Sequence, residues 1–101
     1  MNTLVVHPTD PTTDFLKAVY KDFDWDVIND EVCEADLSEE IANHDRVIFL
    51  GHGTAMGLLG WGRLVFHEGL LGALDDNDDN IFVWCHANEF IIRHCKIESL
   101  K

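Results

Sequence analysis

The sequence predicts an α/β fold with three layers, in which helices cover both faces of a mostly parallel four-stranded sheet. Two observations predict it. Short apolar runs rich in β-branched residues recur along the chain, and segments with apolar residues at helical spacing separate them. This alternation is typical of parallel sheets covered by helices. The chain has 101 residues, 47% of them hydrophobic, which is enough for one domain with its own core.

A strand and a helix are predicted first. Thr3–His7 is largely β-branched and apolar, and Pro8 ends it, as expected for a short buried strand. Pro11–Asp22 is predicted to be a helix that Thr12 or Thr13 caps. Its apolar residues at helical spacing form the stripe that should face the sheet: Phe15, Leu16, Val19 and Tyr20.

A weaker strand, a short helix and a buried strand follow. Asp24–Asn29 alternates partly between polar and apolar residues, which suits a strand near the sheet edge. Asp36–Asn43 is predicted to be a short helix, because Glu39 lies three residues after Asp36 and gives an acidic version of the capping box. Arg46–Leu50 contains an uninterrupted Val-Ile-Phe-Leu run, typical of a parallel strand buried on both faces.

Glycines are concentrated after the third strand, at positions 51, 53, 57, 60 and 62. We expect a small β-hairpin there, with residues 58–59 as one arm, Gly60–Gly62 as the turn and Arg63–Phe66 as the other arm. Glu68–Leu74 is predicted to be a helix that its two glycines weaken.

One more strand and one more helix complete the predicted domain. Asp75–Asn80 is a polar turn, Ile81–Cys85 is the fourth strand, and Asn88 caps a helix that runs to about Ser99. Residues 1–101 are therefore expected to form a single α/β domain. It is either complete or the N-terminal part of a longer domain.

The charge is strongly negative: 19 acidic residues stand against 7 basic ones, for a formal net charge of −12. Such a surface repels the phosphates of nucleic acids and anionic lipids, so neither nucleic acid nor a membrane is expected as a partner. Cationic ligands or basic peptides would be attracted instead. High acidity is also a common route to solubility.

Three cysteines, Cys33, Cys85 and Cys95, form no disulfide framework. The first residues lack the basic and apolar segments of a signal peptide, and no apolar run has the length of a membrane span. These features predict a cytoplasmic protein with free thiols.

The strongest candidate for chemistry is a pair of residues at predicted strand ends. His52 follows the third strand, and Cys85 ends the fourth. If these parallel strands are neighbours, the imidazole and the thiol share one rim of the sheet, where open α/β sheets bind their ligands. A thiol nucleophile needs such a base, and the N–H of Gly53 beside His52 could donate to an oxyanion. The alternative is a structural role for Cys85, since a cysteine at a strand end commonly behaves as a small apolar residue.

The order of these elements resembles that of the caspase-like (clan CD) cysteine peptidases, and the fold is flavodoxin-like in outline. The resemblance spans residues 3–95, and its sequence-specific part is Gly51-His52-Gly53 and Val83-Trp84-Cys85. It implies a hydrolase in which Cys85 is the nucleophile, His52 the general base and Gly53 part of the oxyanion hole. Peptides or proteins, including basic ones, would be its substrates.

The caspase-like sheet usually has six strands, whereas this chain supplies four. The resemblance therefore implies either a part of a longer protein or a trimmed member of the group. A fourth strand at the edge would expose unpaired backbone groups. We therefore expect a second chain or a dimer partner at that edge.

No metal and no cofactor is expected. His52, Cys85 and His86 could be considered for zinc, but adjacent strand residues point to opposite faces and the usual spacing of ligand pairs is missing. Asp75–Asn80 is similar to the start of a calcium loop, but that loop requires glycine at its sixth position, where Asn80 stands.

Two further expectations concern the rim and the rival function. Asp10, Asp14 and Glu89 could add acidic character near the strand ends, which would favour a basic substrate. The alternative to a peptidase is a non-catalytic α/β domain of the same architecture that binds a ligand or a partner at these strand ends.

Overall fold

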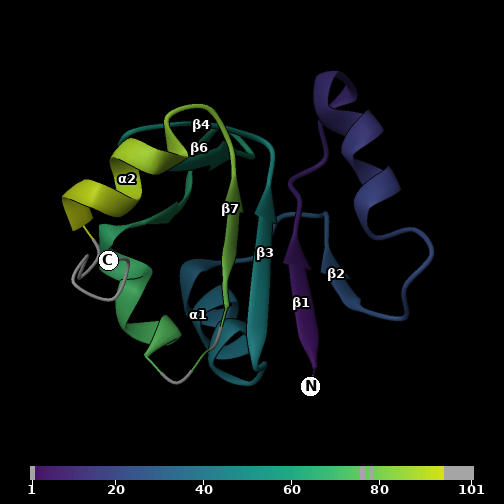
Figure 1. The fold of residues 1–101 in the computed structure, drawn as a ribbon, viewed down its shortest axis with the longest axis horizontal. Coiled ribbons are helices and arrows are strands. Elements are labelled where there is room, and N and C mark those ends of the chain that lie inside the picture. The colour runs from purple at the N-terminus through teal and green to yellow at the C-terminus, as the bar shows by residue number, and fades with distance from the viewer. Residues whose placement is uncertain (1, 76, 78, 95–101) are drawn as a thin grey trace.

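The computed structural model describes residues 2–75, 77 and 79–94, and it contains the predicted four-stranded parallel sheet (Figure 1). The strands lie in the order β2-β1-β3-β7, and all their pairings are parallel. Their bounds are Thr3–Val6 (β1), Asp26–Ile28 (β2), Arg46–Leu50 (β3) and Ile81–Val83 (β7). The α/β fold class is therefore confirmed.

One face of the sheet carries the larger core. Alternate side chains of β3 point to opposite faces, so that Val47 and Phe49 enter this core. Four elements cover the face: α1 (Glu34–Ala42), a small antiparallel sheet, the 3₁₀ helix η2 (Glu68–Leu74) and α2 (Ala87–His94). The core is rich in aromatic rings that contact one another: Phe49, Phe66, Phe82, Trp84 and Phe90.

The opposite face is covered by η1 (Pro11–Val19), where Leu16 packs on the smaller core. This segment is a 3₁₀ helix, and its cap is Asp10 rather than Thr12 or Thr13, because the Asp10 side chain accepts the backbone N–H of Thr12.

The predicted apolar stripe of this segment is correct for Leu16 and Tyr20 and wrong for Phe15 and Val19. Phe15 is 73% exposed and Val19 is 44% exposed, whereas Tyr20 is buried. The buried ring of His7 explains this orientation, because it is hydrogen-bonded to Tyr20 Oη (2.8 Å) and to Thr13 Oγ1 (3.2 Å). These buried hydrogen bonds hold Thr13 and Tyr20 toward the sheet and turn Phe15 outward. Burial lowers the pKa of His7, against an opposing contribution from its bond to Thr13.

The glycine-rich segment forms three strands instead of a two-armed hairpin. They are β4 (His52–Thr54), β5 (Gly57–Gly60) and β6 (Arg63–His67), in that order in one antiparallel sheet. No strand was predicted between the third strand and residue 58, but His52 pairs with Leu59 in β4.

Other predicted boundaries shift by a few residues. Helix α1 starts at Glu34 after Cys33, so the capping box that was predicted at Asp36 is wrong. Strand β7 ends at Val83 and helix α2 starts at Ala87, so Cys85 lies in the turn between them. The predicted continuation of the last helix over residues 95–99 lies outside the described residues.

A pH-dependent contribution to stability is expected from His44, which joins α1 to β2. Its buried ring is hydrogen-bonded to Asp26 Oδ2 (2.7 Å) and to the Glu40 carbonyl (2.6 Å). Burial lowers the pKa of His44, but the bonds to Asp26 and Glu40 outweigh it and the net pKa lies above 6.5. A raised folded-state pKa stabilises the fold below the unfolded pKa, and this contribution is lost as the pH rises through the folded value.

We therefore expect His44→Gln to cost more unfolding free energy at about pH 5.5 than at about pH 8.5, measured by urea denaturation. His86→Gln, at an exposed histidine, is the control. An equal loss at both pH values in His44→Gln would show that His44 is not charged in the folded protein.

Candidate functional site

The two predicted site residues lie beyond the carboxyl ends of neighbouring strands. Strands β3 and β7 pair in parallel, with Leu50 opposite Val83. Just past this pair, the Gly51 N–H donates to the Val83 carbonyl at 3.2 Å. His52 follows one residue after Gly51, beyond β3, and Cys85 follows two residues after Val83, beyond β7. The backbones of both residues are thereby brought to one rim of the sheet.

Trp84 fastens the turn that carries Cys85 to strand β4. Its indole Nε1–H donates to the Thr54 carbonyl at 2.9 Å. A Cβ atom added at Gly53 would overlap the Trp84 ring and would lie 2.7 Å from the Gly57 carbonyl oxygen. Glycine is therefore required at position 53 for steric reasons. The role of its N–H toward an oxyanion stays a prediction.

Cys85 is an exposed free thiol in a tight turn between a strand and a helix. The Ala87 N–H donates back to the Trp84 carbonyl at 3.1 Å, which closes the turn. His86 takes a left-handed conformation with φ 65°, an uncommon one for a residue other than glycine. The strand-turn-helix arrangement presents the thiol to solvent, much as nucleophile elbows present a serine.

His52 is held from the other side by the segment that follows β1. Its Nε2 is hydrogen-bonded to Thr12 Oγ1 and lies 3.6 Å from Asp10 Oδ2. Thr12 in turn donates to Asp10 Oδ1 through its hydroxyl (2.7 Å) and its backbone N–H (2.8 Å). A hydroxyl that gives its proton to Asp10 accepts from His52, so this pattern favours the tautomer with the proton on Nε2. Nδ1 is then the basic nitrogen.

The Asp10 carboxylate is stabilised in its ionised form. Its pKa lies below the ordinary value, because the Thr12 hydroxyl and the Thr12 N–H donate to it and the charge of His52 adds to their effect. A carboxylate beside a histidine orients the ring, and such a carboxylate is the usual third component of a nucleophile–base pair.

The hydrogen bonds of the described residues include none between His52 and Cys85. His52 is exposed, and its ring is hydrogen-bonded to Thr12 and lies beside the Asp10 carboxylate. The fold therefore brings the two residues to one rim, while the ring is engaged with the β1 side of that rim.

The contact of Asp10 and Thr12 with His52 was not predicted from the sequence. Asp10 was considered only as general acidic character and Thr12 only as a helix cap, although both follow the first strand. The available signal was Asp10-Pro11, a typical helix N-cap followed by proline, placed at the carboxyl end of a strand. Asp14 is paired with Lys17 instead, and Glu89 with His86.

Within residues 2–75, 77 and 79–94, no group of three His, Cys, Asp or Glu side chains could hold a metal ion. In the same residues, every helix is too short or too polar to cross a membrane.

Comparison with protein-family models, with curated protein sequences and with solved structures gave no match. The resemblance to caspase-like peptidases therefore rests on the order of the elements and on the residues around His52 and Cys85.

Proposed function

We propose that the chain is a caspase-like cysteine hydrolase domain that cleaves peptide bonds with Cys85 as nucleophile and His52 as base. The observation that carries the proposal is the position of both residues just beyond the last hydrogen bond between β3 and β7. The exposure of the Cys85 thiol and the contact of His52 with Asp10 support it. A reducing cytoplasm is the proposed compartment, because Cys33 and Cys85 are both free thiols.

The proposed reaction needs His52 Nδ1 to face the thiol. Nδ1 takes the thiol proton, and the Cys85 sulfur attacks the carbonyl carbon of the peptide, so that a tetrahedral oxyanion forms. The N–H of Gly53 is the proposed donor to that oxyanion. The imidazolium then gives its proton to the leaving amine, and an acyl-enzyme remains. Water, deprotonated by His52, releases the acid and restores the thiol.

Asp10 is proposed to position His52 through Thr12 and to stabilise the imidazolium. Its distance of 3.6 Å to Nε2 and its two bonds to Thr12 carry this assignment. Because Nε2 faces Asp10, Nδ1 remains for the proton exchange with Cys85.

Hydrolysis of a mixed peptide library, followed by mass spectrometry, tests the proposal. Cys85→Ala is expected to lower the cleavage rate at least about 1,000-fold, since the nucleophile is removed. Cys33→Ala is the matched control, because it removes the other described exposed thiol and should leave cleavage unchanged. Absence of cleavage by the unaltered chain, or equal cleavage by Cys85→Ala, would contradict the proposal.

The rival function is a non-catalytic domain that binds a ligand or a partner at the same rim. The hydrogen bond of His52 to Thr12, rather than to Cys85, favours it. In that case both cysteine variants would behave alike in every assay of hydrolysis.

We also propose that a second chain, or a second copy of this chain, pairs with β7. Among the described strands, β7 is at an edge of the four-stranded sheet. Its side chains Ile81 and Val83 are 43% and 41% exposed, which is high for a strand in register with the buried Ile48 and Leu50. Sedimentation velocity is expected to detect a dimer that Val83→Lys weakens about tenfold or more. A monomer at all concentrations would exclude self-association.

A further inference from the structure

A buried histidine, His7, attaches η1 to the sheet at the carboxyl end of β1. Its Nδ1 lies 2.8 Å from Tyr20 Oη and its Nε2 lies 3.2 Å from Thr13 Oγ1, so the ring contacts η1 near both of its ends. Apolar packing adds less, because Leu16 packs on the smaller core while Phe15 is exposed. The attachment of η1 therefore depends strongly on the hydrogen bonds of one ring.

The hydrogen-bonding pattern around His7 suits a neutral ring. The Thr13 hydroxyl donates to the Asp10 carbonyl at 3.4 Å, so it accepts from the Nε2–H of His7. Nδ1 then carries no proton and accepts from the Tyr20 hydroxyl. The side-chain N–H of Asn29 donates to Tyr20 Oη at 3.4 Å. Tyr20 Oη thus gives its hydrogen to His7 and receives another from Asn29.

A second proton on His7 disrupts this pattern. The new Nδ1–H would point at Tyr20 Oη, which already receives a hydrogen from Asn29. The Tyr20 hydroxyl would have to turn its own hydrogen away, and because Tyr20 is buried this hydrogen would lose its partner. Burial also lowers the pKa of His7, against an opposing contribution from its bond to Thr13. The charged ring is therefore poorly accommodated while η1 is docked.

The charged groups around His7 do not remove this difficulty. Lys17 disfavours a proton on the ring, whereas Asp14 and Asp10 favour it, and the amide that follows β2 is neutral. Lys17 and Asp14 are paired with each other at 2.9 Å, so their effects on the ring largely cancel. His52 also contacts this region, but a charged His52 would be drawn to Asp10, 3.6 Å from its Nε2, and would hold η1 more firmly.

We propose that His7 is an acid-sensitive switch: when its ring takes a second proton, η1 leaves the sheet and the residues that hold His52 move with it. Thr12 is hydrogen-bonded to His52 and Asp10 lies beside the same ring, and both precede Thr13 directly in the chain. The inference does not depend on catalysis, because it concerns only the attachment of η1 and the contacts of His52.

The direction of the pH effect follows from the lowered pKa of His7. When η1 is undocked, water reaches the ring and its pKa returns to the ordinary value of 6.5. A folded-state pKa below this value stabilises the docked form above pH 6.5, and the contribution is lost as the pH falls toward the folded value. Each pH unit in this window favours the undocked form by up to about tenfold, whereas His44 acts in the opposite direction.

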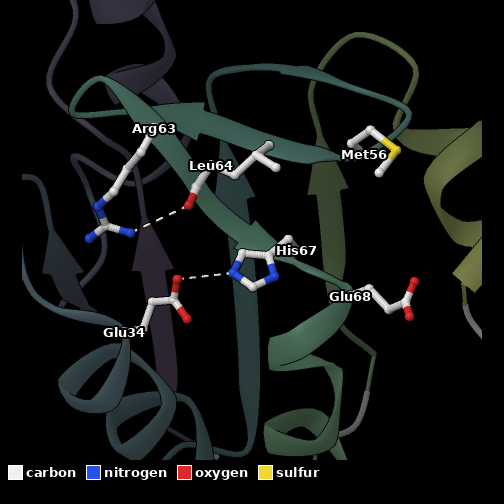
Figure 2. A pocket seen from close by; sticks show the side chains of 6 residues that line it. All are labelled: Glu34, Met56, Arg63, Leu64, His67 and Glu68. Atoms are coloured by element: carbon white, nitrogen blue, oxygen red, sulfur yellow. Dashed lines mark hydrogen bonds and ion pairs between the residues drawn. The ribbon is translucent and has the colours of Figure 1, made fainter.

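His67 provides the matched control. It lies on β6, one of the elements on the sheet face opposite η1, and lines an open pocket of about 370 Å³ (Figure 2). Its Nε2 lies 3.1 Å from Glu34 Oε2. A proton on this ring therefore meets an adjacent carboxylate and solvent, and no contact of η1 has to change.

Hydrogen exchange followed by mass spectrometry at about pH 7.5 and about pH 5.5 tests the switch. Protection factors, which exclude the intrinsic pH dependence of exchange, are expected to fall about three- to tenfold over residues 13–20 and to stay constant in β3. His7→Gln retains an amide donor for Thr13 but takes up no proton, so the fall should disappear. His67→Gln should show the same fall as the unaltered chain.

A ¹⁵N NMR titration of the His7 ring in the unaltered chain keeps the test decisive if His7→Gln fails to fold. His7 is expected to titrate below pH 6.5, with the proton on Nε2 in the neutral ring. Titration at or above 6.5 would overturn the inference, as would an equal loss of protection in β3 or a fall that persists in His7→Gln. Unchanged protection over residues 13–20 would also overturn it, and so would a rise, because the contact of His52 with Asp10 would then dominate.

Discussion

Replacement of Phe49 by alanine is expected to lower the free energy of unfolding by about 3–5 kcal/mol. Phe49 is fully buried in β3, and its ring centroid lies 4.3 Å from that of Phe66 and 5.1 Å from that of Phe82. Its removal leaves a cavity where the parallel sheet meets the antiparallel sheet, and rigid neighbouring rings fill such a cavity poorly. Domains of this size are stable by about 5–15 kcal/mol, so the variant should be close to unfolding.

Phe15→Ala is the control for that experiment. The same side chain is deleted, but from a position that is 73% exposed on η1, so a change within about 0.5 kcal/mol is expected. Urea denaturation of both variants measures the difference. Equal losses would mean that η1 packs against the sheet through the predicted stripe after all.

Replacement of Gly53 by alanine is expected to lower the free energy of unfolding by about 2–3 kcal/mol. It should also impair the proposed activity of His52 and Cys85. The added methyl group would overlap the indole of Trp84 and press on the Gly57 carbonyl. Either Trp84 gives up its hydrogen bond to Thr54 or strand β4 moves away from the turn that carries Cys85. Both adjustments change the position of Cys85 relative to His52.

Gly72→Ala is the matched control, because a Cβ atom at Gly72 would meet nothing within 4 Å. It should change stability by no more than about 0.5 kcal/mol. Thermal unfolding and the fluorescence of Trp84 and its fellow tryptophans report the two effects of Gly53→Ala separately. An unchanged midpoint in Gly53→Ala would show that the turn is not clamped onto β4.

The sheet was predictable from sequence because its signals are local. The Val-Ile-Phe-Leu run of β3 identifies a strand buried on both faces wherever it pairs. The orientation of η1 was not predictable in the same way. It depends on the bonds of His7 to Thr13 and Tyr20, which join residues of different elements inside the fold. Helical periodicity alone could not choose between Phe15 and Tyr20.

The candidate site likewise has a part that local sequence signals predict and a part that depends on contacts between elements. His52 and Cys85 could be selected because each follows an apolar run, and the shared rim follows from parallel pairing. The contact of His52 with Asp10 and Thr12 needed the strand order, since β1 lies next to β3 only in the folded sheet. Strand β4 was missed for a similar reason, because its pairing partner, not its glycine-rich sequence, makes it a strand.

The most direct test of the Cys85–His52 pair is the rate of alkylation of Cys85 by iodoacetamide as a function of pH. Cys33, an exposed free thiol in the same molecule, is the internal reference, and peptide mass spectrometry measures both rates in one sample. Below about pH 7, Cys85 is expected to react about tenfold faster than Cys33, and His52→Ala should remove this advantage. Equal rates for the two thiols at every pH, with no effect of His52→Ala, would contradict the assignment of Cys85 as an activated nucleophile.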